Sequence, residues 1–261
     1  LAKVIPPHLQ VECFAAPSIK DSSACTATDW LKLVQQIQQL QLNGFQHFVI
    51  IHGTDTLSYA AATLARFLGH SCHAIITGSQ YPLLNIEGND TREFTDAIGN
   101  LYLALEQVLA LPSGVYLAFH EQVFHAQSTL KAHTTELDAF VGIRAHQSCD
   151  TTADALIVPN EYIEQAAELS VLNLMLQPIA KQQFILQLKN LLLSPPNFLV
   201  LQGFGTGNIA VNDEILALFE QLYQQRCLPI ISTQVTFGQL DQRYAVSSWI
   251  QSAKVLVNDC H

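Results

Sequence analysis

Short apolar runs alternate along the chain with longer stretches whose apolar residues recur three and four positions apart. Short apolar runs between turn residues are typical of buried strands, and the three-and-four spacing is typical of helices. Their alternation predicts a parallel sheet with helices on both faces. In the first half, the pattern predicts strands at 9–14, 47–51, 72–76 and 114–119 and helices at 30–40, 57–68 and 94–109.

The first predicted helix has sequence signals at both ends. Thr26 and Asp29 stand at its start, where a threonine oxygen can accept a hydrogen bond from a free N–H of the first turn. Asn43 and Gly44 stand at its end, where such residues are typical of a helix stop. These signals predict that the helix lies between Thr26 and Asn43.

A more polar stretch of weak periodicity, residues 144–169, interrupts this rhythm. We place a linker at 151–169, between an N-terminal domain at 1–150 and a C-terminal domain at 170–261. We therefore expect a two-domain α/β protein, with a larger N-terminal parallel-rich sheet flanked by helices and a smaller C-terminal α/β domain. In the second half, the pattern predicts strands at 171–176, 198–202, 228–232 and 254–257 and helices at 178–193 and 211–224.

The composition narrows the class of protein. With 49% hydrophobic and 13% charged residues, the chain can bury a substantial core and is not a disordered protein. The net charge of −10, without any basic run, argues against nucleic acid and membrane as partners. No apolar run is long enough to span a bilayer. The six cysteines include no C-x-x-C pair, so we expect reduced, mostly buried thiols and a cytoplasmic protein.

Small polar side chains follow three of the predicted strands. Each group alone fits ordinary helix capping or turn chemistry. Together, at the carboxyl edge of one parallel sheet, they suit a small zwitterion, whose ammonium needs a carboxylate and whose carboxylate needs hydrogen-bond donors. These residues are Asp21, Ser22 and Ser23 after the first strand, Thr54 and Asp55 after the second, and Ser79 after the third.

Lys131 stands among small residues, in a chain with only 12 lysines and arginines. A lysine in such a place is more often a solvated surface residue than a functional one. If Lys131 is instead buried beside Thr54, desolvation lowers its pKa and makes it a base for the hydroxyl.

Other familiar chemistries are disfavoured. The ten histidines include no H-E-x-x-H spacing, so scattered structural or surface histidines are favoured over a metal site. The glycine-rich stretch 203–207 lacks the Lys-Ser/Thr of a phosphate loop. No G-x-S-x-G occurs, which argues against a serine enzyme of the α/β-hydrolase type.

The order of these motifs resembles the bacterial L-asparaginase family, and most closely its cytoplasmic, type I branch. The resemblance rests on His52-Gly53-Thr54-Asp55-Thr56, on Thr77-Gly78-Ser79-Gln80 and on Lys131-Ala132-His133. Two further stretches extend the resemblance along nearly the whole chain. They are Asp21-Ser22-Ser23 with Trp30, and the Gly-Phe-Gly-Thr-Gly-Asn stretch at 203–208.

The resemblance implies a role for each site residue. Thr54, Asp55 and Lys131 would form a catalytic set that cleaves the side-chain amide of L-asparagine, giving L-aspartate and ammonia. It also implies no metal or organic cofactor and a homodimer or homotetramer. For the substrate, Asp21, Ser22 and Ser23 would form the recognition loop, Ser79 would contact the amide through its backbone, and Asn208 would reach the site at a subunit contact.

One motif of this family has no counterpart in residues 1–261. The family's first strand carries Thr-Gly-Gly-Thr-Ile, with a further threonine commonly assigned as the nucleophile. We expect that strand to precede Leu1, and the chain also stops just after a predicted strand, so we expect both ends to be cut. Residues 1–261 alone are then expected to be nearly inactive.

Three functions stay open. The first is an active asparaginase. The second is a catalytically inactive protein on the same scaffold that binds a small amino acid or another protein. The third is a related glutaminase or other amidohydrolase.

Overall fold

The computed structural model describes residues 5, 9–151, 154–238, 240, 249–250 and 253–258. The chain divides into two compact units, Leu1–Ala167 and Glu168–His261. Each unit has its own sheet and its own apolar core. The α/β class with two domains, expected from the sequence, is confirmed.

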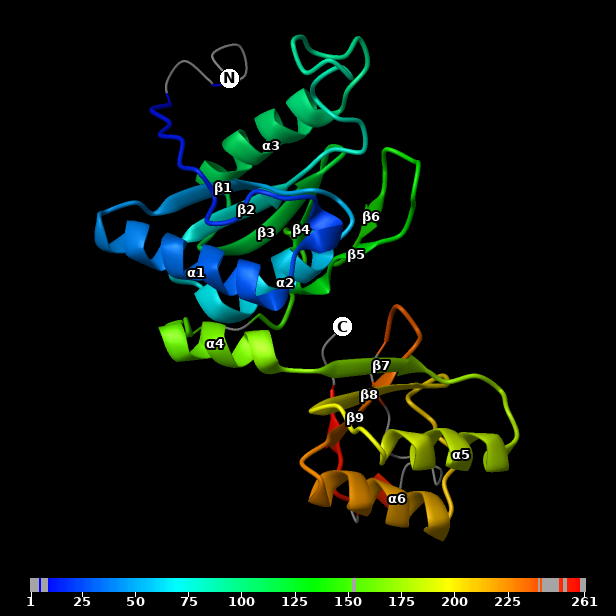
Figure 1. Ribbon diagram of the computed structural model, residues 1–261. Coiled ribbons are helices and arrows are strands. Elements are labelled where there is room, and N and C mark those ends of the chain that lie inside the picture. The colour runs from blue at the N-terminus through cyan, green and yellow to red at the C-terminus, as the bar shows by residue number, and fades with distance from the viewer. Residues whose placement is uncertain are drawn as a thin grey trace. The chain divides into compact units, whose positions relative to one another are not determined.

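The first unit is built on a four-stranded sheet in the order β1-β2-β3-β4 (Figure 1). Its first three strands are parallel, and β4 pairs antiparallel with β3. Because Ile51 lies opposite Thr77, β1 and β2 end at the same edge of the sheet. The strands are β1 (His47–Ile51), β2 (His73–Thr77), β3 (Gly114–Phe119) and β4 (Gln122–His125).

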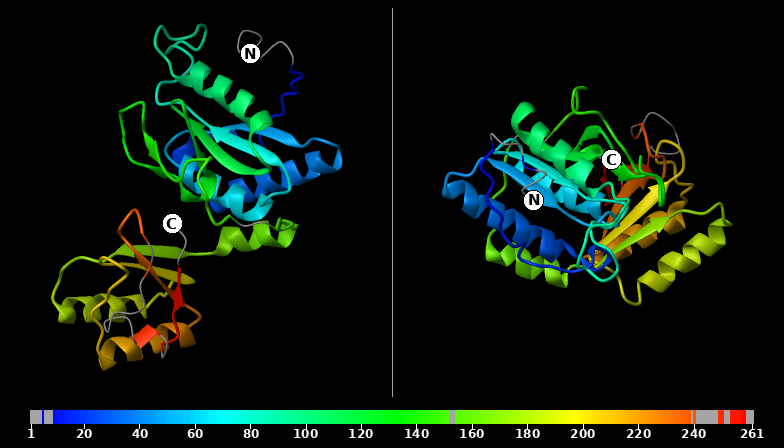
Figure 2. Two further views of the ribbon diagram at one scale, coloured as in Figure 1. Left: turned by 180° about the vertical axis from the view of Figure 1, so that it is seen from behind. Right: turned by 90° about the horizontal axis from the view of Figure 1, so that it is seen from above.

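Helices cover both faces of this sheet, as Figures 1 and 2 show. Successive strand residues point to opposite faces, so each strand contributes to two apolar clusters. Ile76 and Leu117 pack with α1 (Ala27–Leu42) and α2 (Leu57–Leu68) on one face. Ile75 and Ala118 pack with α3 (Ala97–Ala110) on the other. The strands are therefore buried on both faces, which explains their continuous apolar sequences.

Helix α1 begins and ends where its sequence signals predict. Thr26 and Asp29 form a capping box, and Asp29 Oδ2 accepts a hydrogen bond from the Thr26 N–H at 2.8 Å. Burial would raise the pKa of Asp29, but hydrogen bonds from Lys20, Thr26 and Ser18 outweigh it and lower the pKa to about 2. Asn43 ends the helix, and Gly44 follows with a φ of 94° that favours glycine.

Residues 9–14 form no strand, so that prediction is wrong. Val11 is 39% exposed and Phe14 is 49% exposed, and Phe14 packs edge-on against Phe45 with ring centroids 5.3 Å apart. The apolar run therefore covers the outside of the unit instead of entering the sheet.

Several short elements of the first unit were not predicted. Two-residue strands and single helical turns are too short to produce a periodic pattern. Helix α4 lies inside the predicted linker. These elements are η1 (Ser22–Ala24), η2 (Ala126–Ser128), β5 (Leu130–Lys131), β6 (Phe140–Val141) and α4 (Asn160–Glu168). The antiparallel strand β4 was not predicted either.

The second unit has a parallel four-stranded sheet in the order β10-β9-β8-β7. Leu199, Leu201 and Ile231 of this sheet are buried in a cluster with residues of the helices at 181–191 and 213–224. The cluster is the core of the unit. The helices and strands of the second unit are β7 (Val171–Met175), α5 (Lys181–Leu191), β8 (Phe198–Gly203), α6 (Asp213–Gln224), β9 (Leu228–Thr233) and β10 (Leu256–Val257).

Five cysteines lie in the described part of the chain, and all five are free thiols. Only Cys72 and Cys227 are buried, so the expectation of mostly buried thiols is wrong. Burial raises the pKa of Cys72 to about 11, which keeps that thiol protonated. No helix in the described part of the chain has the length and apolar character needed to cross a membrane.

Candidate active site

The turn that carries Thr54 lies between β1 and α2. The His52 N–H donates to the Thr77 carbonyl at 2.8 Å, which extends the β1–β2 pairing by one residue before the chain turns. Gly78 lets the ends of β1 and β2 approach closely, and Gly53 lets the loop of Ser22 approach the turn. A Cβ on Gly53 would lie 2.5 Å from Ser22 Oγ, and a Cβ on Gly78 would collide with the His52 carbonyl. Thr54 therefore lies at the carboxyl edge of the sheet, where α/β folds bind ligands.

Lys131 and Thr54 are in direct contact. Lys131 Nζ donates to Thr54 Oγ1 at 2.9 Å and lies 3.5 Å from Asp55 Oδ1. The Lys131 side chain is 21% exposed, whereas that of Asp55 is 62% exposed. The ion pair with Asp55 is therefore weak, because water screens it. The structure thus brings together the three residues of the implied catalytic set.

Lys131 lies on a two-stranded arm outside the main sheet. Strand β5 pairs with β6 in a two-stranded sheet, and Lys131 lies opposite Phe140. Phe140 is 1% exposed and packs against Phe119 of β3, with ring centroids 4.8 Å apart. The arm is therefore anchored to the core through the residue that pairs with Lys131.

The Asp21–Ser23 loop lies against the Thr54 turn. Thr56 Oγ1 donates to the Ser22 carbonyl at 2.7 Å. Asp21 Oδ1 accepts from the Ser23 hydroxyl at 2.5 Å and from the Ser23 N–H at 2.8 Å. Both hydrogen bonds lower the pKa of Asp21. The structure thus places Ser22 beside the turn, while the hydroxyl of Ser23 is engaged within its own loop.

Ser79 follows β2 and is held in place by a residue that sequence reasoning missed. Asn100 of α3 is 3% exposed, and its Nδ2 donates to the Gly78 carbonyl at 3.0 Å. Its Oδ1 accepts from the His120 N–H at 2.9 Å. Asn100 therefore connects the loops that follow β2 and β3. The only sequence signal was an amide within an otherwise apolar helical stretch, 97–105.

His52 and Trp30 form a second group, and both occur in the sequence motifs, although the sequence predicted no role for them. Trp30 Nε1 donates to His52 Nε2 at 3.3 Å, and His52 Nδ1 lies 2.8 Å from the Gly53 carbonyl oxygen. The Trp30 ring stacks on Tyr59, with centroids 6.2 Å apart. The available signal was the position of His52 directly before the Gly-Thr-Asp-Thr turn.

Asn208 belongs to the second unit and is described only within it. Its loop turns through Gly205 and Gly207, which have positive φ angles of 50° and 88°. Asn208 Nδ2 donates to Thr206 Oγ1 at 3.3 Å. Asn208 Oδ1 is buried and accepts no hydrogen bond from any described residue.

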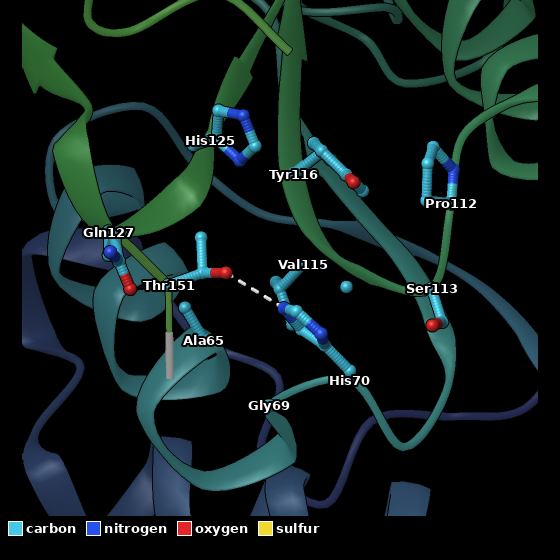
Figure 3. A pocket seen from close by; sticks show the side chains of 11 residues that line it. Ala65, Gly69, His70, Pro112, Ser113, Val115, Tyr116, His125, Gln127 and Thr151 are labelled. Atoms are coloured by element: carbon cyan, nitrogen blue, oxygen red, sulfur yellow. Dashed lines mark hydrogen bonds between the residues drawn. The ribbon is translucent and has the colours of Figure 1, made fainter. Parts of the chain in front are cut away.

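A separate polar pocket of about 190 Å³ lies near the start of β3 (Figure 3). His70, which follows α2, faces Thr151 across this pocket, and its Nε2 lies 2.8 Å from Thr151 Oγ1. Because β1, β2 and β3 are parallel, the start of β3 lies at the sheet edge opposite Thr54. None of the predicted site residues lines the pocket. The described residues also contain no cluster of three histidine, cysteine or acidic side chains that could hold a metal ion.

The chain belongs to the asparaginase family of amidohydrolases. The family model for the N-terminal domain of asparaginases matches residues 6–162, which include Thr54, Asp55 and Lys131.

Individual relatives agree with this assignment. L-asparaginase 1 of Escherichia coli is 26% identical over 250 residues, covering 91% of this chain and 71% of that protein. The crystal structure of L-asparaginase I from Vibrio cholerae has a TM-score of 0.72 and 26% identity, covering 93% of this chain and 74% of that one. A 60 kDa lysophospholipase of Mus musculus is 27% identical over 234 residues, 86% of this chain but 40% of that protein.

Proposed function

We propose that this protein hydrolyses the side-chain amide of L-asparagine to L-aspartate and ammonia by threonine-based catalysis. The observation that carries the proposal is the 2.9 Å contact between Lys131 Nζ and Thr54 Oγ1 at the carboxyl edge of the sheet. A hydroxyl is a weak nucleophile until a base accepts its proton, and a neutral lysine amine at this distance can do so.

The proposed reaction proceeds through an ester on Thr54, the hydroxyl that Lys131 contacts, and not on the further threonine that the family resemblance implies. The Thr54 proton passes to Lys131, and the Thr54 oxygen forms a bond to the amide carbon. The amide nitrogen then takes the proton held by Lys131, and ammonia leaves as the C–N bond breaks. Water attacks the resulting ester, and its oxygen bonds to the carbon. As the bond to Thr54 breaks, one hydrogen of the water returns to the Thr54 oxygen, and the other passes from the carboxyl group to ammonia, giving aspartate and ammonium. The first step needs the amine and the hydroxyl in contact, and the two atoms lie 2.9 Å apart.

We assign the substrate-binding residues from their charges and hydrogen-bonding groups. The Asp55 carboxylate is the partner for the substrate ammonium, because it is exposed beside Thr54. Ser22 and Ser23, with Asp21, form the recognition loop for the amino-acid end of the substrate, and the backbone at Ser79 contacts the amide. In this proposal the protein is a cytoplasmic homodimer or homotetramer, and Asn208 acts from a subunit contact.

Ammonia release tests the proposal. Protein expressed from the full coding region is incubated separately with L-asparagine, L-glutamine and a peptide that carries an internal asparagine, and ammonia is measured with time. Release from L-asparagine above the other two supports the proposal. Faster release from L-glutamine identifies a glutaminase. Calorimetric binding of L-asparagine without ammonia identifies the inactive binding protein.

A further inference from the structure

The two nitrogens of the His52 ring have different partners, and these partners determine its tautomer. An indole N–H can only donate, so the His52 Nε2 that faces Trp30 Nε1 at 3.3 Å must be an acceptor without hydrogen. A carbonyl oxygen can only accept, so Nδ1, 2.8 Å from the Gly53 carbonyl, must carry the hydrogen. Both contacts require the same tautomer of a neutral ring, with its hydrogen on Nδ1.

The carbonyl that His52 holds belongs to the peptide that leads into Thr54. A peptide unit is planar, so a hydrogen bond to the Gly53 oxygen also orients the Thr54 N–H and the start of the Thr54 residue. Ser22 lies close to Gly53 and leaves no room for a side chain there, because a Cβ on Gly53 would lie 2.5 Å from Ser22 Oγ. A glycine has the greatest backbone freedom, so an external anchor restricts this position more than it would another residue.

Trp30 connects this anchor to the folded core. It lies on α1, packs partly buried against the main apolar cluster, and stacks on Tyr59 of α2 with an interplanar angle of 11°. The indole direction is therefore set by two helices. A continuous set of contacts runs from those helices through Trp30 and His52 to the peptide of Thr54.

We propose that Trp30 and His52, the latter in its Nδ1–H tautomer, are a positioning pair that orients the Gly53–Thr54 peptide for the reaction of Thr54. Neither residue is a catalytic residue in this inference, since both act through Gly53. The catalytic part rests on the proposed function, whereas the tautomer does not.

Nuclear magnetic resonance tests the tautomer without any need for activity. Protein labelled with ¹⁵N at histidine is recorded in a long-range ¹H–¹⁵N correlation at about pH 8, above the ordinary histidine pKa. The His52 signals are identified by their loss in His52→Asn. The expected spectrum shows a protonated Nδ1 and an unprotonated Nε2. A neutral ring with its hydrogen on Nε2 would overturn the assignment.

Two substitutions at His52 separate the two ends of the pair. In His52→Asn the amide nitrogen takes the place of Nδ1 and still donates to Gly53. In His52→Gln the amide oxygen takes the place of Nε2 and still accepts from Trp30, but the Gly53 contact is lost. We expect kcat to fall about tenfold in His52→Gln and by less than about threefold in His52→Asn, with KM changing less than about twofold in both.

Trp30→Phe and His70→Gln complete the set. Trp30→Phe keeps a ring for Tyr59 to stack on but removes the same Trp30–His52 hydrogen bond as His52→Asn, so kcat should fall by a similar factor, less than about threefold. His70→Gln alters a histidine at the opposite sheet edge and should leave kcat unchanged. Equal kcat in His52→Gln and His52→Asn, at equal melting temperature, would overturn the positioning role. If wild-type protein releases no ammonia, the proposed function and the positioning role both fail, and the spectrum alone then decides the tautomer.

Discussion

The amine of Lys131 lies 2.9 Å from the hydroxyl of Thr54, although 77 residues separate them in the sequence. Thr54 follows a strand of the main sheet, whereas Lys131 lies on the separate β5–β6 arm. Their contact is therefore a product of tertiary structure, and removing either partner changes the chemistry of the pair without removing a core residue.

Replacing Thr54 by valine should lower kcat for asparagine hydrolysis by at least about 100-fold. Valine nearly matches threonine in shape but has no hydroxyl to attack the amide. Thr63→Val is the matched control, because the Thr63 hydroxyl donates only to the Tyr59 carbonyl within α2. Ammonia release by both folded variants checks the prediction. Wild-type turnover in Thr54→Val would show that Thr54 is not catalytic.

Lys131→Met should lower kcat by a similar factor, about 100-fold, because methionine keeps an apolar stem and lacks the base. Lys189→Met removes an exposed lysine that pairs with Glu214 in the second unit, and it should retain turnover. The melting temperatures of both variants should stay near that of wild type. An active Lys131→Met would assign the base to another group.

Asp55→Asn should act on substrate capture. The substrate ammonium loses a charged partner, and a charge-assisted hydrogen bond of about 2 kcal/mol corresponds to a roughly 30-fold rise in KM. Saturation kinetics on L-asparagine measure this, with Asp213→Asn at the start of α6 as the control. A fall in kcat at unchanged KM would instead place Asp55 in the chemical step.

Asn100→Leu should destabilise the first unit by about 2–4 kcal/mol, because it leaves the Gly78 carbonyl and the His120 N–H unpaired in a buried place. Asn190→Leu, at an exposed position of α5, should change the free energy of unfolding by less than about 0.5 kcal/mol. Urea unfolding followed by circular dichroism measures both. Equal stability of the two variants would contradict the role of Asn100.

Because the pKa of Asp29 is lowered in the folded protein, we expect the free energy of unfolding to fall at acidic pH. Its folded pKa of about 2 lies below the unfolded value of about 3.9, so the carboxylate stabilises the fold above pH 4. This contribution, about 2 kcal/mol, should disappear as the pH falls from about 4 to about 2. Unfolding of wild type and Asp29→Asn should therefore differ at pH 6 and converge near pH 2. A constant difference would refute the assignment.

The main elements could be predicted because turn residues mark both ends of each. Helix 57–68 and strands 47–51 and 114–119 occur at their predicted limits. The strand prediction for residues 9–14 was wrong because an apolar run alone does not show whether a neighbouring strand is present to pair with it. Strands β5 and β6 could not be predicted, since two residues carry no period.

The candidate site was predictable in its residue types but not in its supports. Hydroxyls and carboxylates after consecutive strands indicate a site, because parallel strands end at one edge. Asn100 and His52 gave no comparable signal. An amide on a helix and a single histidine usually satisfy local hydrogen bonds, and only the crossing of α1, α3 and the strand ends makes them supports of the Gly53 and Gly78 peptides.

Lys131, the proposed base, lies on the β5–β6 arm, and we expect this arm to have a lower local stability than the sheet that carries Thr54. A two-stranded ribbon is marginal alone, and opening free energies vary across a fold. Thr54 is held by the sheet, whereas Lys131 depends on the pairing of two short strands and the packing of Phe140. The Leu130–Val141 ladder should therefore exchange its amide hydrogens faster than β1 and β2. If Lys131 is the base, as proposed, molecules with an open arm lack that base, and we expect substitutions at exposed residues 132–136 that loosen the arm to lower turnover.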